Sequence, residues 1–264
     1  MHIHFLDPYR PRSSPIHRLD PRVKFVLTLA FILTTALTPV GAWPVYILLF
    51  SLALSVEILS ELGVGYVLKR ALLALPFVLA ALPMVVTVKG TPIVAVPIGS
   101  WTPTVTLEGV ERFASIAVKS WLSVQMAVVL ATSTPFPDLL LAMRAVGIPR
   151  LMVAIVGLAW RYLFVMADEA LRLTRARASR SGALEGRGGG RLFWRARVTG
   201  GMAGNLFLRS FERADRIYAA MLSRGYDGEV RTLGLPALRT ADVLVALLFI
   251  LLLAVTQGVA QLLW

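Results

Sequence analysis

Two arginines at the ends of charged stretches are the side chains best suited to bind a partner, Arg180 and Arg224. A guanidinium presents five donors in a fixed fork that matches a carboxylate, and the ammonium of lysine does not reproduce this geometry. A cation in the last turn of a helix also interacts favourably with the helix dipole, so a simple helix cap is the alternative interpretation. The pattern therefore leaves two roles open for each position, a cap or a docking cation.

The stretch from Phe207 to Arg231 is too charged to cross a bilayer but has the spacing of an amphipathic helix. Gly225 can take a left-handed conformation and end this helix, which places Arg224 in its last turn. The apolar stripe consists of Phe207, Phe211, Ala214, Tyr218 and Met221 or Leu222. A second stripe, interpreted as the supporting coupling face, holds Arg209, Arg213 and Arg216 beside Glu212 and Asp215. We expect this helix to lie on the membrane surface.

Motifs for catalysis are absent from the sequence. It contains no G-x-x-x-x-G-K-[ST], no H-E-x-x-H and no G-x-S-x-G, and no cysteine. His2 and His4 form an H-x-H pair, which makes them weak candidates as metal ligands because they lie near a chain end. The chain is therefore predicted not to be an enzyme, to bind no cofactor and to have no strong metal site.

The composition identifies an integral membrane protein. Hydrophobic residues make up 57% of the 264 residues and charged residues 16%, outside the range of soluble domains. The net charge of +12 lies at span ends and in a polar insert, where retention on the cytoplasmic side explains it better than nucleic-acid binding. We therefore expect an all-α protein in the cell (inner) membrane, in contact with lipid and not with nucleic acid.

The hydrophobic pattern predicts five transmembrane helices, at 23–40, 44–62, 71–88, 113–132 and 241–264. Pro76 and Pro83 should kink the third, and strand-like segments predict an external hairpin at 89–112. The expected divisions are an N-terminal arm with four spans (1–134), a cytoplasmic coupling-helix region (135–240) and a C-terminal span (241–264). The N-terminus is expected in the cytoplasm as well.

Residues 150–166 are apolar enough to make a sixth span, which is the alternative topology. A crossing there would place residues 167–240, with their 14 arginines, outside the cell, against the positive-inside rule. We therefore predict that Arg150 to Arg180 form one long helix that starts embedded or shallow and does not cross.

Among the ionisable residues within the predicted spans, Lys119 and Glu57 are considered as candidate functional groups. An intramembrane charge is a candidate functional group, but near a helix end a lysine can reach the interface and serve as an anchor. A structural role, such as anchoring, is the one favoured here for Lys119, and Glu57 is interpreted in the same way.

Three segments together resemble the transmembrane T component of energy-coupling-factor (ECF) transporters, and most closely the cobalt-type CbiQ family. They are Ser14 to Lys24 (SPIHRLDPRVK), Thr134 to Leu139 (TPFPDL), and Arg209 to Gly228 with its Ser-Arg-Gly triplet. The resemblance covers nearly the whole chain. In that family two coupling helices each end in an Ala-Arg-Gly-like triplet whose arginine docks on an ATPase subunit.

Carried over to this sequence, the resemblance implies docking by Ser179-Arg180-Ser181 and by Ser223-Arg224-Gly225. Both triplets differ from the family pattern at the first position, and the upstream one also lacks the glycine. Arg177 is therefore an alternative to Arg180 as the upstream docking residue.

The resemblance implies a non-catalytic subunit that links two ABC-type ATPase subunits to a separate membrane subunit that binds the transported ion. The implied ion is cobalt, with nickel as the alternative, and ATP would be used by the partner subunits. A self-sufficient permease or channel is the competing hypothesis, and an integral-membrane enzyme is a third. Lys119 and Glu57 are the residues that favour the permease.

Overall fold

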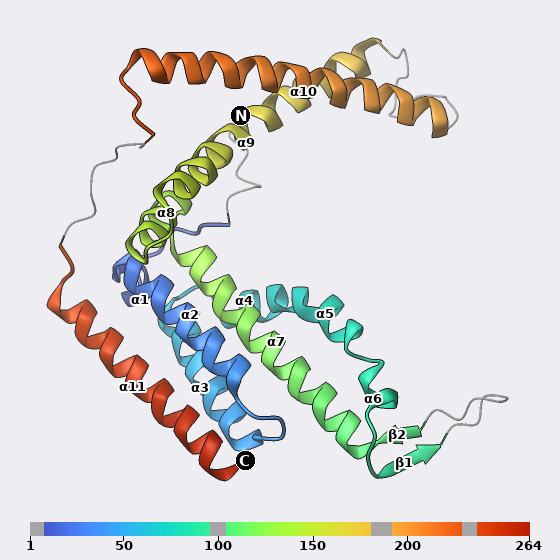
Figure 1. Cartoon of the computed structure of the whole chain (residues 1–264), viewed down its shortest axis with the longest axis vertical. Coiled ribbons are helices and arrows are strands. Elements are labelled where there is room, and N and C mark those ends of the chain that lie inside the picture. Colours follow the sequence, from blue (N-terminus) through green and yellow to red (C-terminus); the bar gives the residue numbers. More distant parts are fainter. Residues whose placement is uncertain (1–7, 96–103, 181–191, 229–236) are drawn as a thin grey trace. The chain divides into compact units, whose positions relative to one another are not determined.

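The computed structural model describes residues 8–95, 104–180, 192–228 and 237–264 (Figure 1). Contacts divide these residues into two units. The bundle unit contains residues 8–146 and 237–264, and the helix-pair unit contains residues 147–180 and 192–228. Each unit is described separately.

Helix α2 (Pro21–Leu37) lies at the centre of the bundle unit, where it packs against α7 (Leu107–Ser133), α8 (Phe136–Ala145) and α11 (Thr240–Leu263). Helix α3 (Trp43–Leu59) contacts α7 and α11, so these four long helices lie side by side in Figure 1. Asp20 caps α2 as expected, since its carboxylate accepts from Arg22 N at 2.8 Å. The buried core joins all four helices and includes Phe31, Leu49, Leu122, Met126 and Leu253.

The third predicted span is a broken helix that starts earlier than expected. It begins with α4 (Val64–Ala71), passes through a 3₁₀ turn (Leu72–Ala74) and continues as α5 (Leu75–Ala80) and α6 (Met84–Thr87). The breaks near Pro76 and Pro83 confirm the predicted kinks. The expected start at residue 71 was wrong, because Gly63 at φ +88° turns the chain and the amphipathic segment after it buries Val67 and Ala71.

The predicted hairpin is present but shorter. Strands β1 (Pro92–Ala95) and β2 (Thr104–Thr106) pair antiparallel. Residues 107–112 were expected in the hairpin and instead form the first turns of α7. The Thr106 side chain caps this helix by accepting from Gly109 N at 3.2 Å, which explains the earlier start.

Four described segments are long and apolar enough to cross a membrane: Val64–Thr87, Leu107–Ser133, Arg150–Arg180 and Thr240–Leu263, with α3 as a shorter apolar helix. Together with the high helix content, they establish an all-α membrane protein. At about 1.5 Å per residue, α2 and α3 reach roughly 25 Å, somewhat less than a typical hydrocarbon core. The number of crossings, and the expectation that residues 150–166 do not cross, stay predictions.

The helix-pair unit consists of α9 (Arg150–Arg180) and α10 (Leu192–Ser223), which pack against each other. Residues 150–180 thus form one continuous helix, as predicted. The short helix α8 was grouped with the coupling region, yet it packs on α2. By contacts, the boundary between the units therefore lies after Val146.

Candidate partner-docking surface

The end of α10 has the backbone geometry of a Schellman motif, which presents Arg224 as the capping residue. Gly225 has φ +76°, its N–H donates to Leu222 O at 3.0 Å, and Tyr226 N donates to Met221 O at 3.0 Å. The predicted left-handed cap at Gly225 is confirmed. Arg224 is exposed, and among the described residues its side chain makes no hydrogen bond or ion pair. The guanidinium is therefore accessible at the end of α10.

The apolar stripe of α10 is exposed along much of its length. Phe207 is 70% exposed and Phe211 is 62% exposed, although both are large aromatic side chains. Further along the helix, Tyr218 and Met221 line a groove of about 490 Å³ between α9 and α10, together with Leu158 of α9. An exposed apolar face of this size in a membrane-associated helix pair is suited to a protein or lipid partner.

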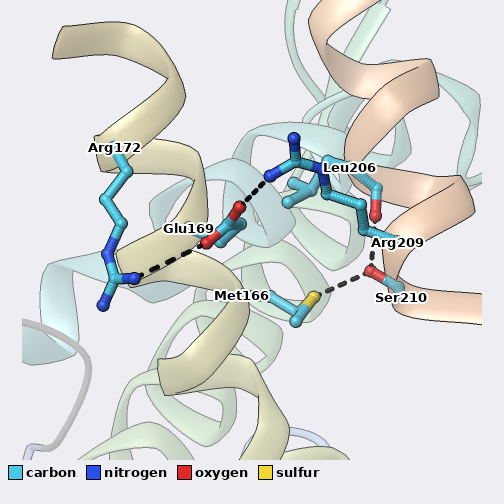
Figure 2. A network of polar contacts seen from close by, with 6 residues as sticks. All are labelled: Met166, Glu169, Arg172, Leu206, Arg209 and Ser210. Carbon is cyan, nitrogen blue, oxygen red and sulfur yellow. Dashed lines mark hydrogen bonds and ion pairs between the residues drawn. The ribbon is translucent and has the colours of Figure 1, made fainter. Parts of the chain in front are cut away.

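An ion pair holds α9 and α10 together near the middle of α10. Figure 2 shows the Glu169 carboxylate between the guanidinium groups of Arg172 and Arg209. Arg209 Nη1 pairs with Glu169 Oε1 across the two helices, and Arg172 Nη1 lies 4.0 Å from Oε2. Ser210 Oγ lies 2.7 Å from Met166 Sδ and from Leu206 O, so its proton can be donated to either atom. The sequence pattern placed Arg209 on the supporting coupling face. In the structure, Arg209 instead forms an ion pair with Glu169 of α9.

The other members of the predicted coupling face are distributed differently. Arg213 lines the groove and is half-buried. Glu212, Asp215 and Arg216 are exposed on α10. Sequence spacing could not reveal the Glu169–Arg209 pair, because the two residues are 40 positions apart.

The two candidates for the upstream docking residue differ in their surroundings. Arg177 Nη1 donates to Thr199 Oγ1 at 3.3 Å, and its guanidinium lies 5.8 Å from the centre of the Trp194 ring. Arg177 therefore ties the end of α9 to the start of α10. Arg180, in the last turn of α9, is exposed and makes no hydrogen bond or ion pair with the described residues. Arg180 is thus the cation that remains available to a partner.

The serines beside these arginines interact with their own helices. Ser179 Oγ donates to Ala176 O and Ser223 Oγ to Ala220 O, both at 3.0 Å. Ser181, His2 and His4 lie outside the described residues. Within the described part of the chain, no group of three or more His, Cys, Asp or Glu side chains could hold a metal ion.

Lys119 and Glu57 are in contrasting environments inside the bundle unit. Lys119 Nζ donates to Ala36 O at 3.2 Å and to Thr38 O at 2.5 Å, so it satisfies carbonyls at the end of α2. Glu57 is 1% exposed, and neither carboxyl oxygen has a hydrogen-bond partner among the described residues. The geometry supports a structural role for Lys119.

Comparison with known proteins identifies the family of this chain. The family CbiQ, described as cobalt transport protein, matches residues 12–234. That range includes both arginine-tipped helices. The chain therefore belongs to the CbiQ family.

Several curated relatives are similar over much of their length. The energy-coupling factor transporter transmembrane protein EcfT of Thermosediminibacter oceani is 28% identical over 266 residues, covering 97% of each chain. EcfT of Ruminiclostridium cellulolyticum is 28% identical over 83% of this chain and 82% of its own. The cobalt transport protein CbiQ of Rhodobacter capsulatus is 28% identical over 58% of this chain and 61% of its own.

Proposed function

We propose that this chain is the non-catalytic transmembrane coupling subunit of an ATP-driven ECF importer for a divalent transition metal, with cobalt as the transported ion. It would link two ABC-type ATPase subunits, which hydrolyse ATP, to a separate membrane subunit that binds the ion. The family membership and the relatives named as ECF transmembrane components support this proposal. The N-terminus and residues 135–240 would then lie in the cytoplasm, where the ATPase subunits are.

The observation that carries the proposal is the pair of long helices that end in exposed arginines. Arg224 extends from a glycine-capped terminus, and Arg180 lies in the last turn of α9. Each can place a guanidinium fork in a groove that contains a carboxylate. Two such tips on one helix pair match two ATPase subunits, one tip for each.

The competing permease hypothesis depended on two residues, Lys119 and Glu57, and the contacts of Lys119 favour a structural role. Lys119 is engaged with the end of α2, which leaves Glu57 as the ionisable side chain that could serve a permeation path. A buried carboxyl without a partner is a specific reason to test this alternative directly.

The deciding experiment is purification of the tagged chain after coexpression with its candidate partner subunits, followed by reconstitution into liposomes and metal analysis. We expect two ATPase subunits to copurify and uptake of Co²⁺ to require ATP. A matched preparation of the chain alone should not transport. Ion uptake by the chain alone would instead establish a permease.

A further inference from the structure

The end of α7, just before α8, is held by the N-terminal arm. The last carbonyl groups of any helix have no partner within the helix. Here Thr132 O accepts from Arg10 N at 2.9 Å, and Ser133 O accepts from Lys24 Nζ at 3.1 Å. Lys24 is 7% exposed and also donates to His17 O at 3.2 Å. One buried ammonium thus joins α7 to the arm.

The arm is itself folded around His17. His17 Nε2 lies 3.0 Å from Arg10 O, and because a carbonyl can only accept, Nε2 carries the proton. His17 Nδ1 then accepts from Ser14 Oγ at 2.7 Å. The Arg10 guanidinium lies 3.7 Å from the centre of the Tyr66 ring of α4, a cation–π contact. We call Arg10, Ser14, His17 and Lys24 the arm clamp.

The chain also returns to the bundle beside the arm clamp. A pocket of about 330 Å³ is lined by Lys24 and Ser133 and by Asp138 in the first turn of α8. Arg239 and Asp242, at the start of α11, line the same pocket. The helix-pair unit is inserted in the sequence between α8 and α11. The starts of α8 and α11, the two bundle helices between which the helix-pair unit is inserted, therefore lie around one pocket with Lys24.

We propose that Lys24 is a positioning residue that fixes the starts of α8 and α11, so that movement of the helix-pair unit inserted between these helices is transmitted to the bundle. This inference rests on the proposed function, in which ATPase subunits move the helix pair. Without the Lys24 ammonium, Ser133 O and His17 O lose their donor and the end of α7 can fray. Part of the movement would then be absorbed by that local fraying, and ATP hydrolysis would continue with less transport.

The same two helices supply a matched control. Lys119 of α7 donates to carbonyls at the end of α2, as Lys24 of α2 donates to a carbonyl at the end of α7. The two lysines therefore have equivalent capping roles at opposite ends of α2. Lys119→Met therefore removes an equivalent contact at the other end of α2, away from the starts of α8 and α11.

The test measures the ATP hydrolysed per ion transported by the complete complex in liposomes. For Lys24→Met we expect an assembled complex that retains ATPase activity, with the ratio raised about fivefold or more. Lys24→Arg, which keeps a long cation, should restore the ratio toward the wild-type value. Lys119→Met should lower the melting temperature by a similar amount and leave the ratio unchanged. Lys24→Gln, a milder change, should raise the ratio less than Lys24→Met.

Other outcomes would overturn the inference. An unchanged ratio in Lys24→Met, or an equal rise in Lys119→Met, would show that Lys24 contributes stability alone. So would failure of every neutral Lys24 variant to assemble while Lys119→Met assembles. Failure of the wild-type chain to recover ATPase subunits would refute the proposed function instead, and it would be seen before any variant is compared.

Discussion

Arg224→Ala separates a helix cap from a docking cation. The Schellman motif is made by backbone groups of residues 221–226 and by the left-handed Gly225, so the substitution leaves it intact. The exposed side chain contributes to the helix through the dipole, which is worth about 0.3–1 kcal/mol. If capping is its whole role, α10 should lose no more than this, and ATPase binding should not change.

A docking role predicts a much larger effect on binding. Removal of a guanidinium that is desolvated against a carboxylate leaves that carboxylate buried and unpaired, at a cost of roughly 2–5 kcal/mol. This corresponds to a loss of affinity of about thirtyfold to several thousandfold. Arg224→Lys keeps the charge but not the fork, so we expect it to restore part of the binding.

The assay is the affinity of the detergent-solubilised chain for the ATPase subunits, with Arg180→Ala and the double variant measured in parallel. Arg172→Ala is the control, because it removes an exposed arginine that lies before the last turn of α9. Normal ATPase binding by the Arg180→Ala, Arg224→Ala double variant would refute the assignment of these helix ends as docking sites. A loss in the double variant larger than the sum of the single losses would show that the two tips act together.

Four further predictions concern other parts of the chain. Lys119→Met should lower the free energy of unfolding by about 1–3 kcal/mol, because two carbonyls lose their donor. Transport per assembled complex should stay within a few fold of the wild-type value. Loss of transport with normal assembly would place Lys119 in the ion path. Burial, followed by the nearby Lys24 and Arg12 cations, lowers the pKa of His17 despite its hydrogen bond to Arg10 O. The contribution of neutral His17 to stability is therefore complete above its ordinary pKa and is lost as the pH falls below it. Melting temperatures from pH 8 to about 5 should fall more steeply for the wild type than for His17→Asn, and parallel curves would contradict this. A double-mutant cycle with Glu169→Gln and Arg209→Gln should give a coupling energy of about 0.2–1 kcal/mol, since the arginine is largely exposed, and zero coupling would show that the ion pair does not stabilise the helix pair. A cysteine at Gly189, outside the described residues, should react with an impermeant thiol reagent in broken cells and not in intact cells; labelling of intact cells would reverse the predicted topology.

Local signals were sufficient to predict most helices and the end of α10. Asp20 before Pro21 marked the start of α2, and Gly225 marked the end of α10. The positions of Pro76 and Pro83 indicated the breaks in the third span. Each of these signals acts within a few residues of the feature that it determines, which is why sequence reasoning could find it.

Contacts between distant residues could not be predicted in this way. Lys24 and Ser133 are 109 positions apart, and Glu169 and Arg209 are 40 positions apart. A weaker signal was nevertheless present, because a lysine in the first turns of an apolar helix must find polar partners when it is buried. The sequence left Arg177 and Arg180 as alternatives, and the difference between them depends on Thr199 and Trp194 of another helix.

Helix α9 shows why length and composition do not decide a topology. Its apolar first half qualifies it to cross a membrane, yet no residue of the helix is buried, and Leu151, Met152 and Ile155 are all exposed. Exposed apolar side chains need lipid or a protein partner, and a helix embedded at the interface satisfies that need without crossing. Its basic second half leads into the arginine-rich segment, for which the positive-inside rule predicts a cytoplasmic location. An embedded start followed by a cytoplasmic end would satisfy both requirements, and under the proposed function it would place Arg180 on the side of the ATPase subunits.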